Sequence, residues 1–133
     1  MRKLLYLFVV LTLILSCKNK ESSDEKIKEE NLVLVKDGVF TEWYPGKKKI
    51  KYQGGQDELG NRDGKWVFYD ENGTEMSYTL FNKGKKDGFS LVKYPNGNIH
   101  YTGEYQNDKM VGVWTTYDTE GNILSKKDFG KRK

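Results

Sequence analysis

The sequence predicts an all-β protein built from tandem β-hairpins that form one elongated, single-layer antiparallel sheet. Glycine recurs too often for long helices, and no apolar run keeps the three-and-four spacing of a helix face. A fixed period of 20 to 50 residues indicates units that bury their apolar faces only by stacking on one another. Two series of glycines repeat at intervals of 24 residues: Gly64, Gly88 and Gly112, and Gly73, Gly97 and Gly121.

Each unit is predicted to contain two strands joined by a turn. The first strand lies between the two glycines, where eight residues rich in Trp, Phe, Tyr, Val and Thr suit a half-buried sheet. Asn72-Gly73 and Asn96-Gly97 follow and predict hairpin turns, because Asn and Gly both tolerate positive φ. The second strand ends on an aromatic residue in the three clear units, and polar segments return the chain to the next unit. These aromatic residues are Phe81, Tyr105 and Phe129, again 24 apart.

A less regular copy precedes the three clear ones. Residues 37–46 are DGVFTEWYPG, in which Tyr44 and Pro45 match Tyr94 and Pro95. Residues 50–54 match 99–103 once two extra residues are allowed in the turn. The repeat domain therefore has about four units, and the apolar run at 32–35 is expected to add an edge strand to the first hairpin.

The repeated pattern, D-G-x-W-x-x-Y-x-x-x-G followed by a second short strand, resembles the MORN repeat and in particular its bacterial variant. The resemblance extends over residues 37–129. The third copy departs from it with Phe89 and Ser90 where the tryptophan usually stands, and the fourth begins with Val111 in place of aspartate. The repeat-motif positions are Gly38, Tyr44, Gly64, Trp66, Tyr69, Gly73, Gly88, Tyr94, Gly97, Gly112, Trp114, Tyr117 and Gly121.

The N-terminus has the layout of a lipoprotein signal peptide. Arg2 and Lys3 precede an apolar run at 4–15 that is too short to span a membrane, and Ser16-Cys17 follows. Residues 14–17 resemble the lipobox of bacterial lipoproteins, which implies a diacylglyceryl thioether on Cys17 and cleavage after Ser16. Cys17 is the only cysteine, so no disulfide competes for it. The alternative is a spare thiol in an ordinary secretory signal.

These features predict four segments. Residues 1–16 are the signal peptide, and residues 17–31 are the lipidated cysteine and a polar tether whose composition cannot offset the entropy of ordering. Residues 32–129 are the repeat domain, and 130–133 are a basic tail. The expected location is the cell envelope, anchored to the membrane by lipid. By family analogy Lys18 after the cysteine favours the outer membrane, with the protein facing either the periplasm or the cell surface, and the inner membrane is the alternative.

The formal net charge of +4 does not predict nucleic-acid binding, because it is concentrated at the chain ends. Arg2 and Lys3 lie in the signal peptide, and residues 131–133 supply another +3. Residues 38–129 contain thirteen basic and thirteen acidic side chains, so the repeats have no net charge. No basic face is required by this distribution.

No motif in the sequence predicts an enzyme, a cofactor or a metal site. The one histidine, His100, has no second histidine or cysteine with which to form a metal or nucleophile site. The acidic turns at 57–58, 70–71 and 118–120 lack the alternating ligands of a calcium loop. Nucleophile elbows and glycine-rich phosphate loops are also missing from the sequence.

The aromatic residues are the remaining functional signal. Most are expected to pack between hairpins, but a single layer has two faces and no helix to cover the second. The candidate binding face consists of Trp43, Trp66, Tyr101 and Trp114.

The leading hypothesis is a lipid-anchored, non-enzymatic scaffold that binds a protein or a glycan; the oligomeric state is left open. The resemblance also implies an antitoxin or immunity protein. A third alternative is a module for phospholipid headgroups, with Lys47-Lys48-Lys49 and Lys85-Lys86 lining a face beside the membrane.

Overall fold

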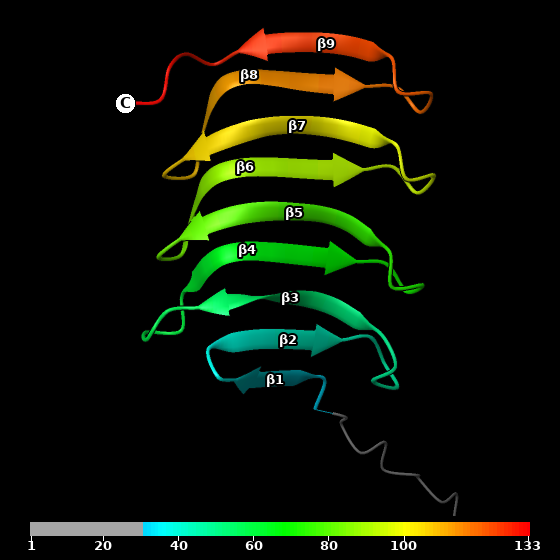
Figure 1. Ribbon diagram of the computed structural model, residues 1–133, viewed down its shortest axis with the longest axis vertical. Coiled ribbons are helices and arrows are strands. Elements are labelled where there is room, and N and C mark those ends of the chain that lie inside the picture. The colour runs from blue at the N-terminus through cyan, green and yellow to red at the C-terminus, as the bar shows by residue number, and fades with distance from the viewer. Residues whose placement is uncertain (1–30) are drawn as a thin grey trace, which may run out of the picture.

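The chain folds into one open antiparallel sheet whose nine strands follow one another in sequence order (Figure 1). The computed structural model describes residues 31–133, so the predicted signal peptide, Cys17 and most of the tether lie outside the described residues. The predicted all-β fold of hairpin repeats is confirmed. The strands are β1 (Val33–Lys36), β2 (Val39–Trp43), β3 (Ile50–Gln56), β4 (Arg62–Tyr69), β5 (Glu75–Asn82), β6 (Lys85–Lys93), β7 (Ile99–Gln106), β8 (Lys109–Tyr117) and β9 (Ile123–Asp128).

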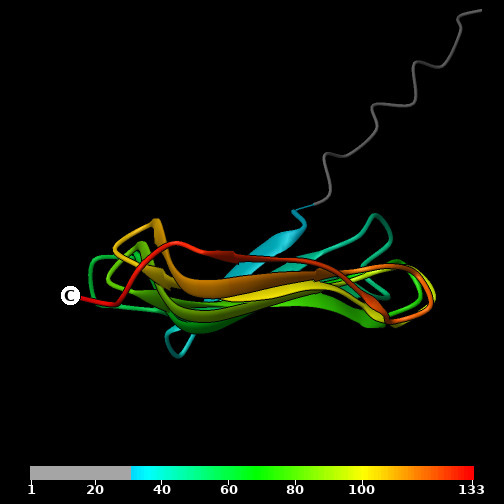
Figure 2. The ribbon, with the colours of Figure 1, turned by 90° about the horizontal axis from the view of Figure 1, so that it is seen from above.

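The sheet is a single layer. Viewed along the stack of strands it is a thin, gently curved ribbon with β1 turned away from the plane of the others (Figure 2). Residues 31–133 contain no helix able to cross a membrane. The edge strand expected from the apolar run at 32–35 is β1, which pairs with β2 and keeps its side chains exposed. Within residues 31–133, no helix or second sheet covers either face of the sheet.

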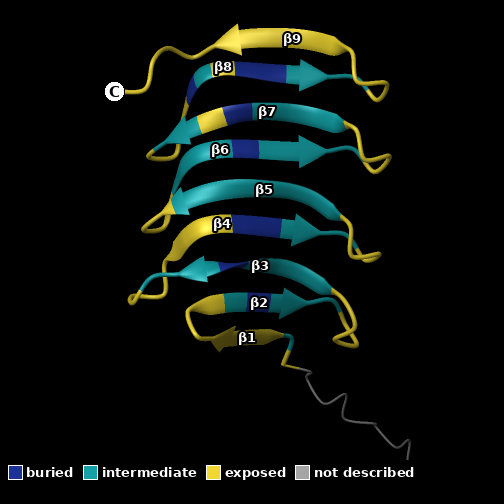
Figure 3. Cartoon of the chain, viewed as in Figure 1, coloured by how far each residue is buried: buried dark blue, intermediate teal, exposed yellow. Residues whose placement is uncertain are grey.

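Buried side chains are few and lie in the middle of the strands (Figure 3). A single layer has no second sheet to pack against, so the side chains of neighbouring strands cover one another. Trp66 and Trp114 are the largest buried residues, with 6% and 7% of their surface exposed. The other buried residues of the described chain are Thr41, Gly54, Val67, Ser90, Gly103, Val111 and Thr115.

The turns at one end of the strands differ from those that the Asn-Gly pairs predict. In the two turns with Asn-Gly pairs, positive φ occurs at Gly73 and Gly97, while Asn72 and Asn96 keep negative φ. Gly73 donates its backbone N–H to the Asp70 carbonyl at 2.9 Å, which closes a four-residue type I turn. The hairpins were predicted correctly, but each turn is a type I turn followed by a left-handed glycine, with a register shift in the flanking strands.

Two-residue turns with positive φ at both positions lie at the opposite end of the strands, where they connect one unit to the next. Lys83 and Gly84 have φ of 47° and 87°, and Asn107 and Asp108 have 48° and 66°. These are the mirror-image turns whose twist matches that of the flanking strands. Gly84 donates its N–H to the Arg62 carbonyl at 2.8 Å, so each turn also contacts the preceding unit.

The motif tyrosines occupy two different positions in the sheet. Tyr69 and Tyr117 are the last residues of β4 and β8, whereas Tyr44 and Tyr94 begin the turns, where the other units have Asp70 and Asp118. Each turn tyrosine donates its hydroxyl to the carbonyl of the strand tyrosine in the next unit, Tyr44 to Tyr69 and Tyr94 to Tyr117, both at 2.8 Å. These bonds join unit to unit along this end of the sheet.

Candidate binding face

One face of the sheet carries most of the large aromatic side chains. Side chains alternate between the two faces along a strand, so Trp66 and Trp114 lie on the same face as the aromatic side chains they contact. Trp66 has the Phe40 ring at 5.2 Å and the Phe81 ring at 6.3 Å between centroids. Trp114 has Tyr105 at 4.9 Å and Tyr101 at 5.9 Å. We call this side the tryptophan face.

Each tryptophan lies flat on the backbone of the preceding strand because a glycine stands beneath it. A Cβ on Gly54 would be 2.4 Å from the Trp66 ring, and a Cβ on Gly103 would be 2.1 Å from the Trp114 ring. The indole N–H groups complete the contact: Trp66 Nε1 donates to the Gly55 carbonyl at 2.7 Å, and Trp114 Nε1 to the Glu104 carbonyl at 3.1 Å. Both rings are thereby fixed as a floor for the side chains around them.

The third unit replaces this pair with two small hydroxyl residues. Ser90 stands in the tryptophan position and pairs with Thr79, whose side-chain oxygen is 2.8 Å from that of Ser90. Ser90 is 3% exposed. Ser90 thus replaces the tryptophan of the repeat pattern, and Thr79 replaces the glycine on the strand beside it. The two indole rings of the tryptophan face therefore lie in units two and four.

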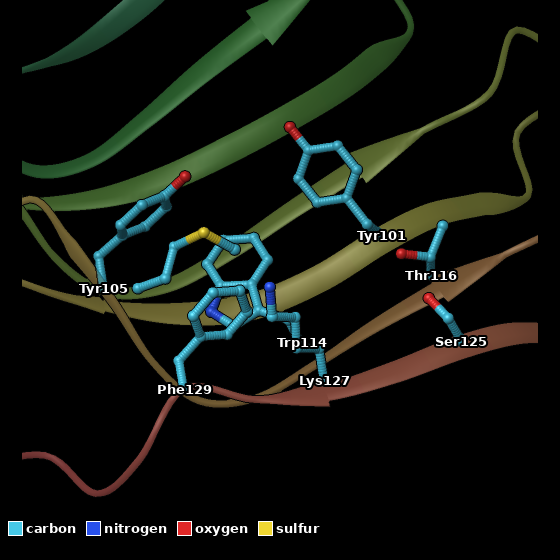
Figure 4. Close-up of a pocket in the computed structure, with 8 residues that line it drawn as sticks. Tyr101, Tyr105, Trp114, Thr116, Ser125, Lys127 and Phe129 are labelled. Atoms are coloured by element: carbon cyan, nitrogen blue, oxygen red, sulfur yellow. The ribbon is translucent and has the colours of Figure 1, made fainter.

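A hollow of about 380 Å³ surrounds Trp114, between β7, β8 and β9 (Figure 4). Tyr101 and Tyr105 rise from β7, and Phe129 lies beyond the end of β9, so rings stand on two sides of the indole. Lys127, Thr116 and Ser125 add an ammonium group and two hydroxyl groups. We call this the C-terminal hollow. It is lined by Tyr101, Tyr105, Met110, Trp114, Thr116, Ser125, Lys127 and Phe129.

A second, smaller hollow of about 190 Å³ surrounds Trp66 on the same face. We call it the N-terminal hollow. Its residues correspond to those of the C-terminal hollow at a spacing of 48 positions, two repeat lengths: Trp66 to Trp114, Phe81 to Phe129 and Ser77 to Ser125. The sheet therefore forms similar hollows twice, in the two units that contain tryptophan. The N-terminal hollow is lined by Tyr52, Arg62, Trp66, Val67, Phe68, Ser77, Thr79, Phe81 and Lys86.

Cationic side chains lie over the rings of both hollows. The Arg62 guanidinium is 4.5 Å from the Trp66 ring centroid and 5.4 Å from that of Phe81. Lys127 Nζ is 4.8 Å from the Phe129 ring. Attraction to the negative face of a ring holds such a cation at the surface without neutralising its charge.

Lys86 connects the two hollows. It lines the N-terminal hollow, and its Nζ lies 4.9 Å from the ring of Tyr105, which lines the C-terminal hollow. Partial burial raises the pKa of the Tyr105 phenol, which therefore stays protonated near neutral pH. The two hollows and the residues between them form one continuous surface.

The four residues of the predicted binding face have different surroundings. Trp66 and Trp114 are buried and form the floors of the hollows, and half-buried Tyr101 lines the C-terminal hollow. Trp43, at the end of β2, lines neither hollow. Arg62 and Lys127 were not predicted, and Lys86 was considered only as part of the Lys85-Lys86 cluster for headgroup binding. The 24-residue spacing of Arg62 and Lys86 indicated these two positions in the sequence. It was not distinctive, because a basic residue after a turn is common on any exposed surface.

The two lysine clusters considered for headgroup binding lie at opposite ends of the strands. Lys47-Lys48-Lys49 are in the turn between β2 and β3, whereas Lys85-Lys86 begin β6 at the end with the two-residue turns. They do not form one patch. Within the described residues, no group of three His, Cys, Asp or Glu side chains is placed to hold a metal ion.

Comparison with known families identifies the repeats. Residues 62–79, 86–107 and 110–129 match the model of the MORN repeat variant. These segments are the second, third and fourth units and include both hollows apart from Tyr52 and Phe81. No curated protein matched the chain. The matched family is a repeat, so the comparison points to a surface formed by stacked units.

Proposed function

We propose that this protein with MORN repeat variants is a lipid-anchored, non-enzymatic scaffold of the bacterial cell envelope that binds its partner with the tryptophan face. The observation that carries the proposal is the pair of equivalent hollows on a face that no second layer of the described chain covers. Exposed aromatic side chains next to polar groups are typical of binding surfaces. A shallow surface with no cluster of acids or histidines among its lining residues favours binding over catalysis.

The membrane anchor in this proposal is Cys17, which lies outside the described residues. The apolar run at 4–15 and the Ser16-Cys17 pair support it. The expected test result is that the full-length protein incorporates a clickable palmitate analogue and partitions with membranes, and that the Cys17→Ser variant does neither. Unchanged partitioning of Cys17→Ser would rule out the lipid anchor.

The binding face can be tested with two matched double variants of the full-length protein. Met110→Ser with Phe129→Ser removes two exposed apolar side chains from the C-terminal hollow, 36% and 38% exposed. Val113→Ser with Leu124→Ser removes two from the opposite face, 54% and 63% exposed. Urea denaturation confirms that each variant is folded before binding is measured.

Each variant is cross-linked in detergent-solubilised envelope membranes. The expected result is one specific cross-linked species with the unmodified chain and the opposite-face variant, lost in the hollow variant. Equal capture by both variants, or none by the unmodified chain, contradicts the proposed face.

A further inference from the structure

The two hollows lie at a fixed distance set by the sheet. Trp66 is in β4 and Trp114 is in β8, four strands further along. At a strand spacing of about 4.8 Å the hollow floors are roughly 19 Å apart. The contact between Lys86 and Tyr105 joins the two hollows, so the surface from one hollow to the other is continuous. A ligand that fills both hollows is therefore extended and has a repeating structure.

The charges on this surface have one sign. No Asp or Glu lines either hollow, whereas Arg62, Lys86 and Lys127 do. Among the described residues, the basic side chains that form ion pairs lie elsewhere: Lys51 with Glu42, Lys65 and Lys93 with Glu75, and Arg132 with Asp87. Within residues 31–133 the three cations of the hollows thus form no ion pair with a carboxylate, which makes this surface complementary to an anionic ligand.

The positive surface continues beyond the C-terminal hollow. A neighbouring depression shares Met110 and Phe129 with it and adds three basic side chains, Lys109, Lys131 and Lys133. Lys131 and Lys133 belong to the basic tail, whereas Lys109 belongs to the repeats, which have equal numbers of acidic and basic side chains.

The polar groups on this surface belong to side chains. The backbone N–H and C=O groups of β4 to β8 are engaged in the antiparallel ladders on both sides of each strand. A peptide lying on the face would have its own amides removed from water without backbone partners, at a cost. A sugar chain presents hydroxyl groups that Ser, Thr and Tyr side chains can bond, and apolar ring faces that pack on aromatic side chains.

We propose that the tryptophan face binds a linear polysaccharide that carries carboxylate groups, with one chain occupying both hollows. This inference rests on the proposed function and gives its ligand class. Sugar rings lie against Tyr101, Tyr105 and Phe129 in one hollow and against Tyr52 and Phe81 in the other. Arg62, Lys86 and Lys127 bind the carboxylates.

Occupation of two hollows by one chain has a measurable consequence. A chain long enough to reach both hollows fills the second at the effective concentration set by binding in the first. Its overall affinity therefore exceeds the affinity of either hollow alone. We expect uronic-acid oligomers that span both hollows to bind at least about 100-fold more tightly than oligomers that fill one. Binding should also weaken with salt, because surface charges are screened.

The experiment is a calorimetric titration of the full-length protein in detergent with oligogalacturonate and alginate oligomers graded in length from the dimer upward. Neutral cello-oligosaccharides and a polyglutamate peptide are the comparison ligands, and anionic phospholipid vesicles are tested without detergent on the full-length Cys17→Ser variant, which lacks the proposed lipid anchor. Lys127→Gln disables the cation of the C-terminal hollow. Lys126→Gln is its matched control, because it removes the same charge from the adjacent residue, which points to the opposite face.

The expected result is binding of at least one uronic-acid series, with a steep gain in affinity at one chain length. Lys127→Gln should lose that gain and Lys126→Gln should keep it. Failure of both uronic-acid series to bind overturns the inference, as does tighter binding of polyglutamate or vesicles, or equal binding of neutral chains. If envelope capture still depends on Met110 and Phe129 in that case, the proposed function stands and only the ligand class is wrong.

Discussion

Trp114 lies so close to the backbone of Gly103 that a Cβ on the glycine would be 2.1 Å from the indole ring. The Gly54 and Trp66 pair repeats the arrangement at 2.4 Å, and the third unit uses Thr79 and Ser90 instead. The size of the side chain at one position thus depends on the size of the side chain opposite it on the neighbouring strand. This coupling of large with small side chains determines which units contain a hollow.

The first prediction concerns this pair. Gly103→Ala should destabilise the protein by about 1–3 kcal/mol, because the added methyl group overlaps a ring that is held on both sides. In the Trp114→Ser background the same change should cost far less, giving a coupling energy of about 1–3 kcal/mol in a double-mutant cycle measured by urea denaturation. Additive effects would mean that the indole does not restrict the glycine.

Gly121→Ala is the control for this cycle. A Cβ there would have no atom within 4 Å, so its cost arises from the positive φ of 92° alone. That cost should be the same with and without Trp114.

The second prediction concerns the hydroxyl bonds between units. Tyr94→Phe removes the hydrogen bond to the Tyr117 carbonyl and should cost about 0.5–1.5 kcal/mol of unfolding free energy. Tyr44→Phe removes the equivalent bond to Tyr69 and should cost a similar amount. In chemical denaturation, an unchanged dependence of the unfolding free energy on denaturant concentration would confirm that only the hydrogen bond is lost. Two variants as stable as the original would show that these bonds contribute nothing to stability.

The third prediction concerns acid stability. The side-chain amide and backbone N–H of Asn122 bond the Asp118 carboxylate and lower its pKa, and Asn61 does the same for Asp57. The backbone N–H of Thr74 lowers the pKa of Asp70. A carboxylate with a lowered pKa stabilises the fold above its ordinary pKa, and that stability is lost as the pH falls through the lower value of the folded state.

Unfolding free energy should therefore be level above about pH 5 and should fall below about pH 4. Asp118→Asn should be less stable at neutral pH and show a shallower acid decline, because one titrating group is gone. An unchanged acid slope in this variant would exclude Asp118 as a contributor.

The fourth prediction uses the turn between β5 and β6. Lys83 has a positive φ of 47°, a conformation that Asn adopts more easily than Lys. Lys83→Asn should stabilise the protein by roughly 0.5 kcal/mol, and its backbone N–H keeps its bond to the Asp63 carboxylate. Lys85→Asn makes the same substitution within a strand and should not stabilise. A gain in Lys85→Asn equal to that in Lys83→Asn would point to charge and not to backbone conformation.

The 24-residue period determined the architecture without help from the structure. Regular glycines, aromatic residues and turn signals predicted hairpins in series, because strand pairing between neighbours along the chain depends on local sequence. The predicted edge strand at 32–35 also formed, since a short apolar run needs only one partner strand. The sequence was a less reliable guide to the turns. Asn72-Gly73 lies in a hairpin as predicted, but the turn is of type I and is closed by the hydrogen bond from the Gly73 N–H to the Asp70 carbonyl.

Only the tertiary structure decided which aromatic residues form the binding surface. Trp66 and Trp114 were predicted as part of that face, but each has a glycine beneath it and becomes the buried floor of a hollow, with half-buried or exposed rings and cations around it. Lys86 and Tyr105 are nineteen positions apart in sequence and meet because β6 and β7 are adjacent. The sequence determined the units and their order. Which side chains lie opposite one another depends on the register of neighbouring strands. That register is established only when the strands pair in the sheet.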